Sequence, residues 1–178
     1  MIDEITTRKL TKADLEEIMR VEKGAWGAEK LDASEETVIG RFEENPGGFI
    51  GYFENEGTAS VLMGFVYFRR VLEYRNFRKW VQASQAPLAP NGNFAYVVNV
   101  SVFPKRQGHG RRMMNSVARM LQSDGIEEVA LGSRDTTENF YSKCGYLVYE
   151  RIAEWWPDDE KSAGKGILMR AELQKVYR

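Results

Sequence analysis

Residues 97–121 read VVNVSVFPKRQGHGRRMMNSVARML, and this stretch decides the fold. Its opening residues are rich in β-branched valine and predict a strand, which Pro104 ends because proline has no N–H to give to a sheet. From Met113 the apolar residues recur at helical spacing and predict a helix that runs to Leu121. A short basic loop with two glycines therefore joins a strand to a helix.

This loop predicts a phosphate-binding cradle. Glycines allow backbone N–H groups to turn inward at a helix N-terminus, where unpaired donors and the positive end of the helix dipole attract an anion. The loop has neither the Gly-Lys-Ser/Thr ending of a Walker loop nor the three glycines of a dinucleotide fingerprint. An ordinary basic turn remains the alternative interpretation. The cradle residues are Lys105, Arg106, Gln107, Gly108, His109, Gly110, Arg111 and Arg112.

The stretch resembles the acyl-CoA loop of the GNAT superfamily of N-acetyltransferases. The family pattern is Arg or Gln, two residues, Gly, one residue, Gly or Ala, and then a helix that opens with paired apolar residues. Residues 105–110 are similar to this pattern, Met113-Met114 is the apolar pair, and Lys105 departs from the usual first residue. Starting the motif at Gln107 instead predicts the same cradle.

A second motif strengthens the resemblance. Residues 139–146 read NFYSKCGY and resemble the family's closing motif, in which an Asn and a Phe-Tyr helix precede a turn into a strand. The resemblance runs from about Ile5 to about Leu173. It implies an α/β (α+β) fold with a GNAT-like mixed, mostly antiparallel central sheet of about six to seven strands flanked by helices. It implies one acetyltransferase domain over residues 1–178, with residues 69–93 as an insertion or substrate-side loop.

Composition narrows the functional class. The chain has 178 residues, of which 43% are hydrophobic and 29% charged, as expected for a soluble globular domain. Its 25 basic and 26 acidic residues give a net charge of −1, so no global field draws it to nucleic acid or an anionic membrane. No apolar run approaches the roughly 20 residues of a membrane span, and the acidic N-terminus lacks a signal core. We therefore expect a cytoplasmic protein without a nucleic-acid or membrane partner.

Cysteine and histidine each occur once, as Cys144 and His109. A single cysteine excludes an internal disulfide, and the pair is too small a set for a zinc site. A Cys–His nucleophile would need chance proximity of the two side chains. We predict no metal.

The resemblance implies acetyl-CoA as co-substrate. Its pyrophosphate would lie on the amides of the cradle, its pantetheine would pair near Val100 and Val102, and Asn139 would hold the cofactor. The amine would attack the thioester directly in a ternary complex. Tyr141 would give a proton to the leaving thiolate, since a phenol with an ordinary pKa of about 10 is protonated at neutral pH.

The general base is left open. Relatives often carry a Glu or His on the central strand, whereas residues 96–103 contain neither, and Asn99 cannot accept a proton usefully. Glu22 is the named candidate, acting through water or by binding a cationic amine. Glu29, Asp32 and bulk water are the alternatives.

The acceptor is expected to be a small primary amine, with a peptide or protein amine second. The segment from Glu22 to Arg41 loosely resembles the arylalkylamine branch of the superfamily. Acidic residues there and at 158–160 would suit a cation, and Trp26, Trp155 and Trp156 could offer cation–π faces or simply pack. A non-catalytic acyl-CoA-binding sensor or interaction module is the alternative function, and a nucleotide-phosphate binder is the third. The sequence predicts no oligomeric state.

Three further expectations concern local structure. Thr11 with Asp14, and Ser34, are predicted to cap two helices, the first ending near Glu22 before a loop over residues 23–33. Residues 69–93 interleave basic and aromatic side chains, which can indicate nucleic-acid binding. A substrate-covering loop with a short helix is the preferred prediction, because loops this long inside a domain tend to be functional.

Overall fold

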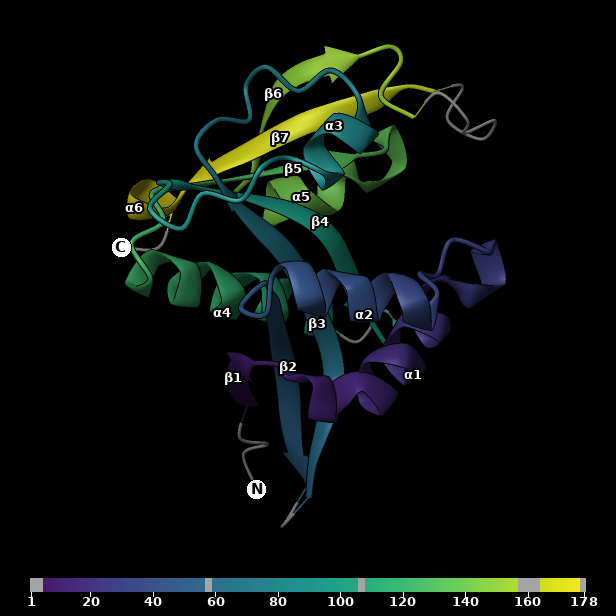
Figure 1. The fold of residues 1–178 in the computed structure, drawn as a ribbon. Helices are drawn as coiled ribbons and strands as arrows, with labels where there is room; N and C mark the ends of the chain where they lie inside the picture. Colours follow the sequence, from purple (N-terminus) through teal and green to yellow (C-terminus); the bar gives the residue numbers. More distant parts are fainter. Residues whose placement is uncertain (1–4, 57–58, 106–107, 157–163, 177–178) are drawn as a thin grey trace. The chain divides into compact units, whose positions relative to one another are not determined.

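A computed structural model describes residues 5–56, 59–105, 108–156 and 164–176, which form a mixed α/β fold (Figure 1). The strands of this described part make one mostly antiparallel seven-stranded sheet in the order β1-β2-β3-β4-β5-β7-β6. They are β1 (Ile5–Lys9), β2 (Phe49–Glu56), β3 (Ala59–Val71), β4 (Phe94–Val102), β5 (Glu128–Ser133), β6 (Leu147–Ile152) and β7 (Gly166–Glu172). The α-helices are α1 (Leu15–Trp26), α2 (Glu35–Glu44), α3 (Trp80–Ser84), α4 (His109–Ser123), α5 (Glu138–Lys143) and α6 (Leu173–Val176). The predicted fold class is confirmed.

The residues group into two compact units. The first unit comprises residues 1–67 and 99–117, and the second comprises residues 68–98 and 118–178. Each unit has its own buried side chains, and each is described by itself.

The first unit is built on the long β2–β3 hairpin, with β1 beside β2 (Figure 1). The hairpin pairs from Phe49 opposite Tyr67 onward, and residues such as Phe49 and Phe65 are fully buried. Phe49 stacks on Phe42 of α2 with ring centroids 4.2 Å apart, so aromatic packing ties α2 to the hairpin.

Both predicted helix caps are present in the first unit. The Asp14 carboxylate accepts a hydrogen bond from the Thr11 N–H at 2.8 Å, just before α1. The Ser34 hydroxyl accepts one from the Thr37 N–H at 3.2 Å and starts α2. These side chains satisfy N–H groups that the first turn of a helix leaves without partners.

The end of α1 differs from the prediction. The helix does not stop near Glu22 but continues to Trp26, so Lys23 and Gly24 are helical. The physical reason is close packing, because a Cβ atom on Gly24 would lie 2.5 Å from the ring of Phe103. Gly24 admits this aromatic ring and does not terminate the helix.

The second unit carries β4 and β5 as a parallel pair from Phe94 to Val97, with β7 and β6 antiparallel beyond β5. Its core is strongly aromatic, and Tyr74, Tyr96 and Trp155 are fully buried there. The strands β6 and β7 pair antiparallel and form a hairpin at the end of the sheet.

The basic and aromatic residues of 69–93 are used inside the second unit. The strand β3 takes the first three of these residues, and α3 is the short helix that the sequence predicts. Arg69 Nε donates to the Ala86 carbonyl at 2.8 Å, and Arg70 Nε donates to the Gly92 carbonyl at 2.6 Å. Arg75 forms an ion pair of 3.2 Å with Glu128. These arginines hold the segment together, which argues against a nucleic-acid surface here.

No helix in the described part of the chain is both long enough and apolar enough to cross a membrane.

Candidate functional site

The most unusual group of the first unit is the carboxylate of Glu22. The residue is 1% exposed, on the face of α1 that also buries Ile18 and Val21. A buried carboxylate is strongly unfavourable unless hydrogen bonds compensate for its lost hydration. Its surroundings therefore have to supply donors.

Four donor contacts surround this carboxylate. The Ala33 N–H donates to Oε1 at 2.9 Å, and Asn99 Nδ2 reaches both oxygens at 3.1 and 3.2 Å. The Ser101 hydroxyl makes a very short hydrogen bond to Oε2. Glu22 thus joins α1 to strand β4 and to the backbone just before α2. Glu22, the candidate for the general base, therefore lies against β4, a strand that has no carboxylate of its own.

Trp26 extends this network by one bond. Its indole N–H donates to the Ser101 hydroxyl at 2.9 Å. Lys105 Nζ lies 5.0 Å from the centroid of the Trp26 ring and 3.6 Å from a Glu29 oxygen. One face of Trp26 is therefore occupied by a lysine of the protein itself.

The other two acids named as alternatives lie differently. Glu29 is exposed and is engaged with Lys105, and Asp32 is exposed. Of the three acids, Glu22 is the one with hydrogen bonds to β4.

The predicted cradle lies at the start of α4. Gly108 has φ of +80°, a left-handed conformation that favours glycine, and a Cβ there would meet no atom within 4 Å. The helix begins at His109, so Gly110, Arg111 and Arg112 belong to its first turn and not to the loop as predicted. The first turn of a helix has N–H groups without intrahelical partners, which suits an anion. Arg106 and Gln107 lie outside the described residues.

The His109 side chain turns inward. It is 3% exposed, with Nδ1 3.9 Å from Glu54 Oε1 and 3.4 Å from an Arg112 nitrogen. The neighbouring Lys105, Arg111 and Arg112 are exposed. His109 could therefore serve an anion through its backbone N–H, while the exposed cations supply charge.

Val100 and Val102 lie on β4 beyond Val97, where the parallel pairing of β4 with β5 ends. Both are partly exposed. The predicted pairing of their backbone groups with pantetheine stays a prediction.

Tyr141 and Asn139 belong to α5 of the second unit. Tyr141 contacts the rings of Phe140 and Tyr146, with centroids 5.0 and 5.9 Å away. Burial, and to a smaller extent Cys144, raises the pKa of the Tyr141 phenol above its usual 10. Asn139 is exposed on the same short helix. A protonated phenol at neutral pH is the form that a proton donor requires.

The tryptophans divide between packing and surface roles. Trp155 is fully buried, and Cβ atoms built on Gly132 and Gly166 would come within 2.4 and 2.5 Å of it. Of the two alternatives left open for Trp155, a cation–π face or packing, the structure therefore shows packing. Trp156 stacks on Trp80 with centroids 5.7 Å apart. The acidic residues 158–160 lie outside the described residues.

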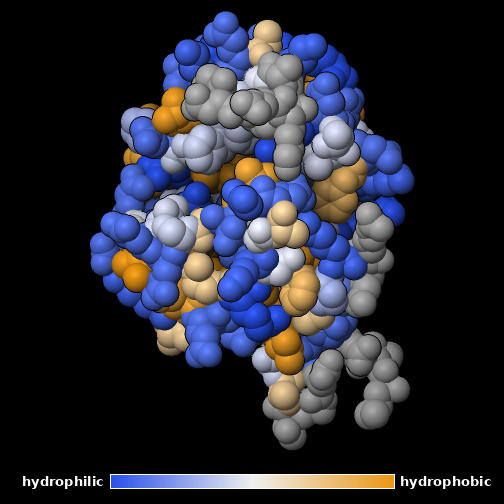
Figure 2. All heavy atoms as spheres, turned by 90° about the vertical axis from the view of Figure 1, so that its right-hand side faces the viewer, coloured by the Kyte–Doolittle hydropathy of each residue, from blue (hydrophilic) through white to orange (hydrophobic). Residues whose placement is uncertain are grey.

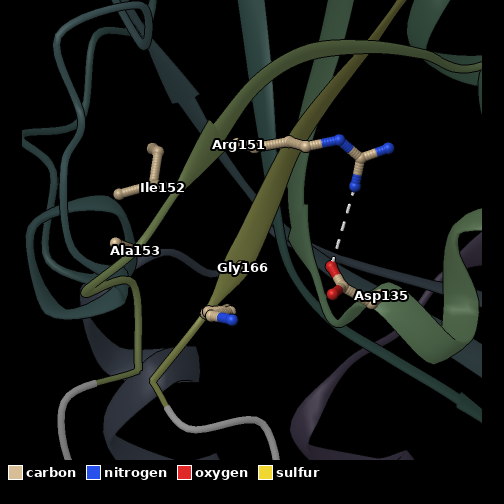
Figure 3. Close-up of a pocket in the computed structure, with 6 residues that line it drawn as sticks. Asp135, Arg151, Ile152, Ala153 and Gly166 are labelled. Atoms are coloured by element: carbon tan, nitrogen blue, oxygen red, sulfur yellow. Dashed lines mark ion pairs between the residues drawn. The ribbon is translucent and has the colours of Figure 1, made fainter.

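A separate cavity of about 200 Å³ lies at the β6–β7 end of the second unit. Figure 3 shows the Arg151 side chain directed toward Asp135, with an Nη1–Oδ1 distance of 3.8 Å. Arg151 also forms an ion pair of 2.9 Å with Glu138. The remaining lining residues are Ile152, Ala153, Lys165 and Gly166. This mixed-charge hollow contains none of the predicted site residues.

The face drawn in Figure 2 is mostly hydrophilic, with hydrophobic residues in small groups. Among the described residues, no three His, Cys, Asp or Glu side chains gather as a metal site would require.

Sequence reasoning missed the roles of Asn99 and Ser101. Both are polar, and they alternate with valines along β4, so they share one face of the strand. That alternation was the available signal. The partner on the other side, Glu22, is 77 and 79 positions away in the sequence, and periodicity does not reveal such a pairing.

Residues 14–146 match the model of the acetyltransferase (GNAT) family. The match spans well over half of the chain, and the chain belongs to that family. No curated protein matches it closely enough to add a more specific relationship.

Solved structures agree on the fold at low sequence identity. The loading GNATL domain of CurA from Lyngbya majuscula has a TM-score of 0.76 and 17% identity, covering 97% of this chain and 100% of that one. The GphF GNAT-like decarboxylase in complex with isobutyryl-CoA has a TM-score of 0.72 and 18% identity, covering 94% of this chain and 99% of that one. The ribosomal-protein-S18-alanine N-acetyltransferase from Escherichia coli has a TM-score of 0.68 and 17% identity, covering 96% of this chain and 94% of that one.

Proposed function

We propose that this protein is an acetyl-CoA-dependent N-acetyltransferase that moves the acetyl group directly to a primary amine. A small amine is the first choice of acceptor, and a peptide or protein amine is the second. The observation that carries the proposal is the junction before α4, where Gly108 at φ +80° precedes a helix with exposed cations in its first turn. The family membership and the isobutyryl-CoA held by one structural neighbour support an acyl-CoA ligand.

In this proposal the cradle binds the pyrophosphate. The amides of residues 108–111 donate to its oxygens, and the side chains of Lys105, Arg111 and Arg112 add positive charge. The backbone of β4 near Val100 and Val102 pairs with the pantetheine, and Asn139 contributes from α5. Arg106 and Gln107 complete the cradle, as the resemblance implies.

The reaction is a direct transfer in a ternary complex. The amine loses a proton to water, its nitrogen forms a bond to the thioester carbon, and the C–S bond breaks. Tyr141 gives a proton to the departing thiolate and is reprotonated as the new amide nitrogen loses its second proton. An oxyanion develops on the carbonyl during attack, and a backbone N–H near Val100 is the proposed donor to it.

Glu22 serves the acceptor side of the site. It places a negative charge beside β4, where a primary amine approaches as a cation at neutral pH. Four protein donor contacts already surround its oxygens, so we assign it to attraction and positioning of the amine. Proton removal then falls to water.

A thiol-release assay tests this function. Acetyl-CoA is incubated with the protein and 2-phenylethylamine, spermidine or a short peptide with a free N-terminal amine, beside calorimetry with acetyl-CoA alone. Free CoA with any of these amines supports the acetyltransferase. Tight binding without release supports a non-catalytic acyl-CoA sensor, and absence of binding overturns the cradle.

A further inference from the structure

We propose that Asn99 is the residue that receives the acceptor amine, through its side-chain carbonyl oxygen, and that Glu22 fixes the orientation of this amide. The inference rests on the proposed function and assigns the acceptor contact within the first unit. It begins with the donors and acceptors around Glu22.

A carboxylate accepts hydrogen bonds and donates none, so the Asn99 nitrogen must face Glu22. The contacts agree, because Nδ2 lies 3.1 and 3.2 Å from the two oxygens of Glu22. The amide is planar, and its carbonyl oxygen Oδ1 is therefore directed away from the carboxylate. Glu22 selects one of the two possible orientations of Asn99.

The Ser101 proton decides whether Oδ1 already has a donor. Ser101 Oγ is 3.1 Å from Asn99 Oδ1 but makes a much shorter contact with Glu22 Oε2. A hydroxyl has one proton, and the bond to a charged carboxylate is the stronger of the two. Trp26 donates its N–H to the same Oγ at 2.9 Å, which leaves the Ser101 proton for Glu22. Within the described residues, Asn99 Oδ1 is then left without a proton from this network.

Burial and charge match a cationic amine. Glu22 and Ser101 are buried, while Asn99 is partly exposed, so Asn99 is the one of these three that a ligand can reach. An ammonium group has only donors, and Oδ1 is only an acceptor. The Glu22 charge lies one side chain behind Asn99 and favours a cation at Oδ1. The chemical class is therefore a primary amine that binds in its protonated form.

The test exchanges the two polar groups. Glu22→Gln removes the charge and replaces one of the two oxygens that accept from Asn99 Nδ2 by an N–H₂ group, so the Asn99 amide loses part of what fixes its orientation. Asn99→Asp places two carboxylates together. The double variant Glu22→Gln/Asn99→Asp keeps shape and charge and again presents an acceptor outward. An exposed pair of the same chemistry, Asn93 Nδ2 to Glu127 Oε1 at 3.2 Å, provides the matched control Glu127→Gln/Asn93→Asp.

Thiol release is measured with 2-phenylethylamine, spermidine and the short peptide, with the calorimetric Kd for acetyl-CoA and the Tm followed in parallel. Loss of a hydrogen bond to a charged group predicts a KM for the amine about 10- to 100-fold higher in Glu22→Gln and Asn99→Ala, with the Kd for acetyl-CoA nearly unchanged. The double variant should regain most of the amine affinity, and the control pair should leave every parameter unchanged.

The outcomes are separable. The role of Asn99 alone is overturned if the wild-type protein is active but Asn99→Ala leaves the amine KM unaltered. It is also overturned if the double variant does not regain the amine affinity. Wild-type protein that binds acetyl-CoA but releases no thiol with any of the three probes overturns the proposed amine acetylation and this inference with it. If Asn99→Ala does not fold, the double variant decides.

Discussion

The indole N–H of Trp26 and the hydroxyl of Ser101 are joined by a hydrogen bond of 2.9 Å between residues 75 positions apart. This bond makes the hydroxyl an acceptor, and its own proton goes to the nearer Glu22 carboxylate. Trp26, at the C-terminal end of α1, is thus tied to the polar side chains of β4.

Trp26→Phe is expected to lower the free energy of unfolding by about 1–2 kcal/mol, from the lost hydrogen bond together with a smaller ring. Trp80→Phe is the matched control, since Trp80 stacks on Trp156 and its indole nitrogen has no hydrogen-bond partner in the described part of the chain. Urea denaturation of both variants measures the difference. Equal losses would show that the bond to Ser101 contributes nothing beyond ring size.

The contrast between the cradle at Gly108 and the hydrogen bonds of Glu22 shows what the sequence can and cannot reveal. The cradle is local, because its glycines, its cations and the following helix lie within a few residues, and spacing alone predicts it. The hydrogen bonds of Glu22 connect residues 77 and 79 positions apart, and only the packing of α1 on β4 creates them.

Close packing explains the wrong prediction for the end of α1 and decides between the two alternatives left open for Trp155. The helix α1 was expected to end near Glu22, but it continues, and Gly24 within it makes room for the Phe103 ring. Trp155 could have offered an aromatic face or simply packed, and Gly132 and Gly166 open a buried space in which it packs. In both cases a glycine and an aromatic ring that are separated in the sequence pack together in the fold, and this contact determines the local structure.

Gly108→Val is expected to weaken acetyl-CoA binding at least about 10-fold. A β-branched residue at φ of +80° is strained by about 1–2 kcal/mol, and relief of that strain turns the backbone amides out of the cradle. Gly47→Val is the control, because Gly47 has open space and no positive φ. Calorimetry with acetyl-CoA gives both affinities. Unchanged binding in Gly108→Val would move the cofactor site elsewhere.

Tyr141→Phe is expected to lower kcat about 100-fold and to leave the Kd for acetyl-CoA nearly unchanged, as for loss of a general acid. Tyr149→Phe removes the same atom from an exposed tyrosine and should have little effect. Burial raises the pKa of Tyr141 above its ordinary value of 10, so the phenol stays protonated at every lower pH. The kcat profile should then show no loss due to Tyr141 below about pH 10. Unaltered turnover in Tyr141→Phe would remove it from the mechanism.

The Arg8–Asp14 pair predicts an acid-dependent loss of stability in the first unit. The hydrogen bond from Arg8 is the main cause that lowers the pKa of Asp14 from 3.8 to about 2. A carboxyl with a lowered pKa in the folded state stabilises the protein above the pKa of the unfolded chain. That contribution is lost as the pH falls from about 4 through 2.

Asp14→Asn should therefore reduce the free energy of unfolding by about 1 kcal/mol at pH 7 and by almost nothing near pH 2. The value at pH 7 is discounted because Arg8 is half exposed and solvent screens the ion pair. Denaturation curves at the two pH values measure the difference. A loss that is the same at both would attribute the effect to the helix cap and not to the ion pair.

The contact between Gly24 and Phe103 gives a prediction whose sign depends on the background. Alanine at position 24 would place its Cβ 2.5 Å from the Phe103 ring, so Gly24→Ala should destabilise the protein by about 1–3 kcal/mol through overpacking. The ring would have to move, and α1 would be displaced two residues from Glu22. We therefore expect the amine KM to rise along with the loss of stability.

In a Phe103→Ala background the same change should stabilise the protein. Without the ring there is room for the methyl group, and replacing glycine by alanine inside a helix is favourable by about 0.5–1 kcal/mol. A double-mutant cycle by urea denaturation measures this reversal directly. If Gly24→Ala were stabilising in both backgrounds, α1 would not pack against Phe103 as described. The continuation of the helix past Glu22, which places Trp26 within reach of Ser101, would then need another cause.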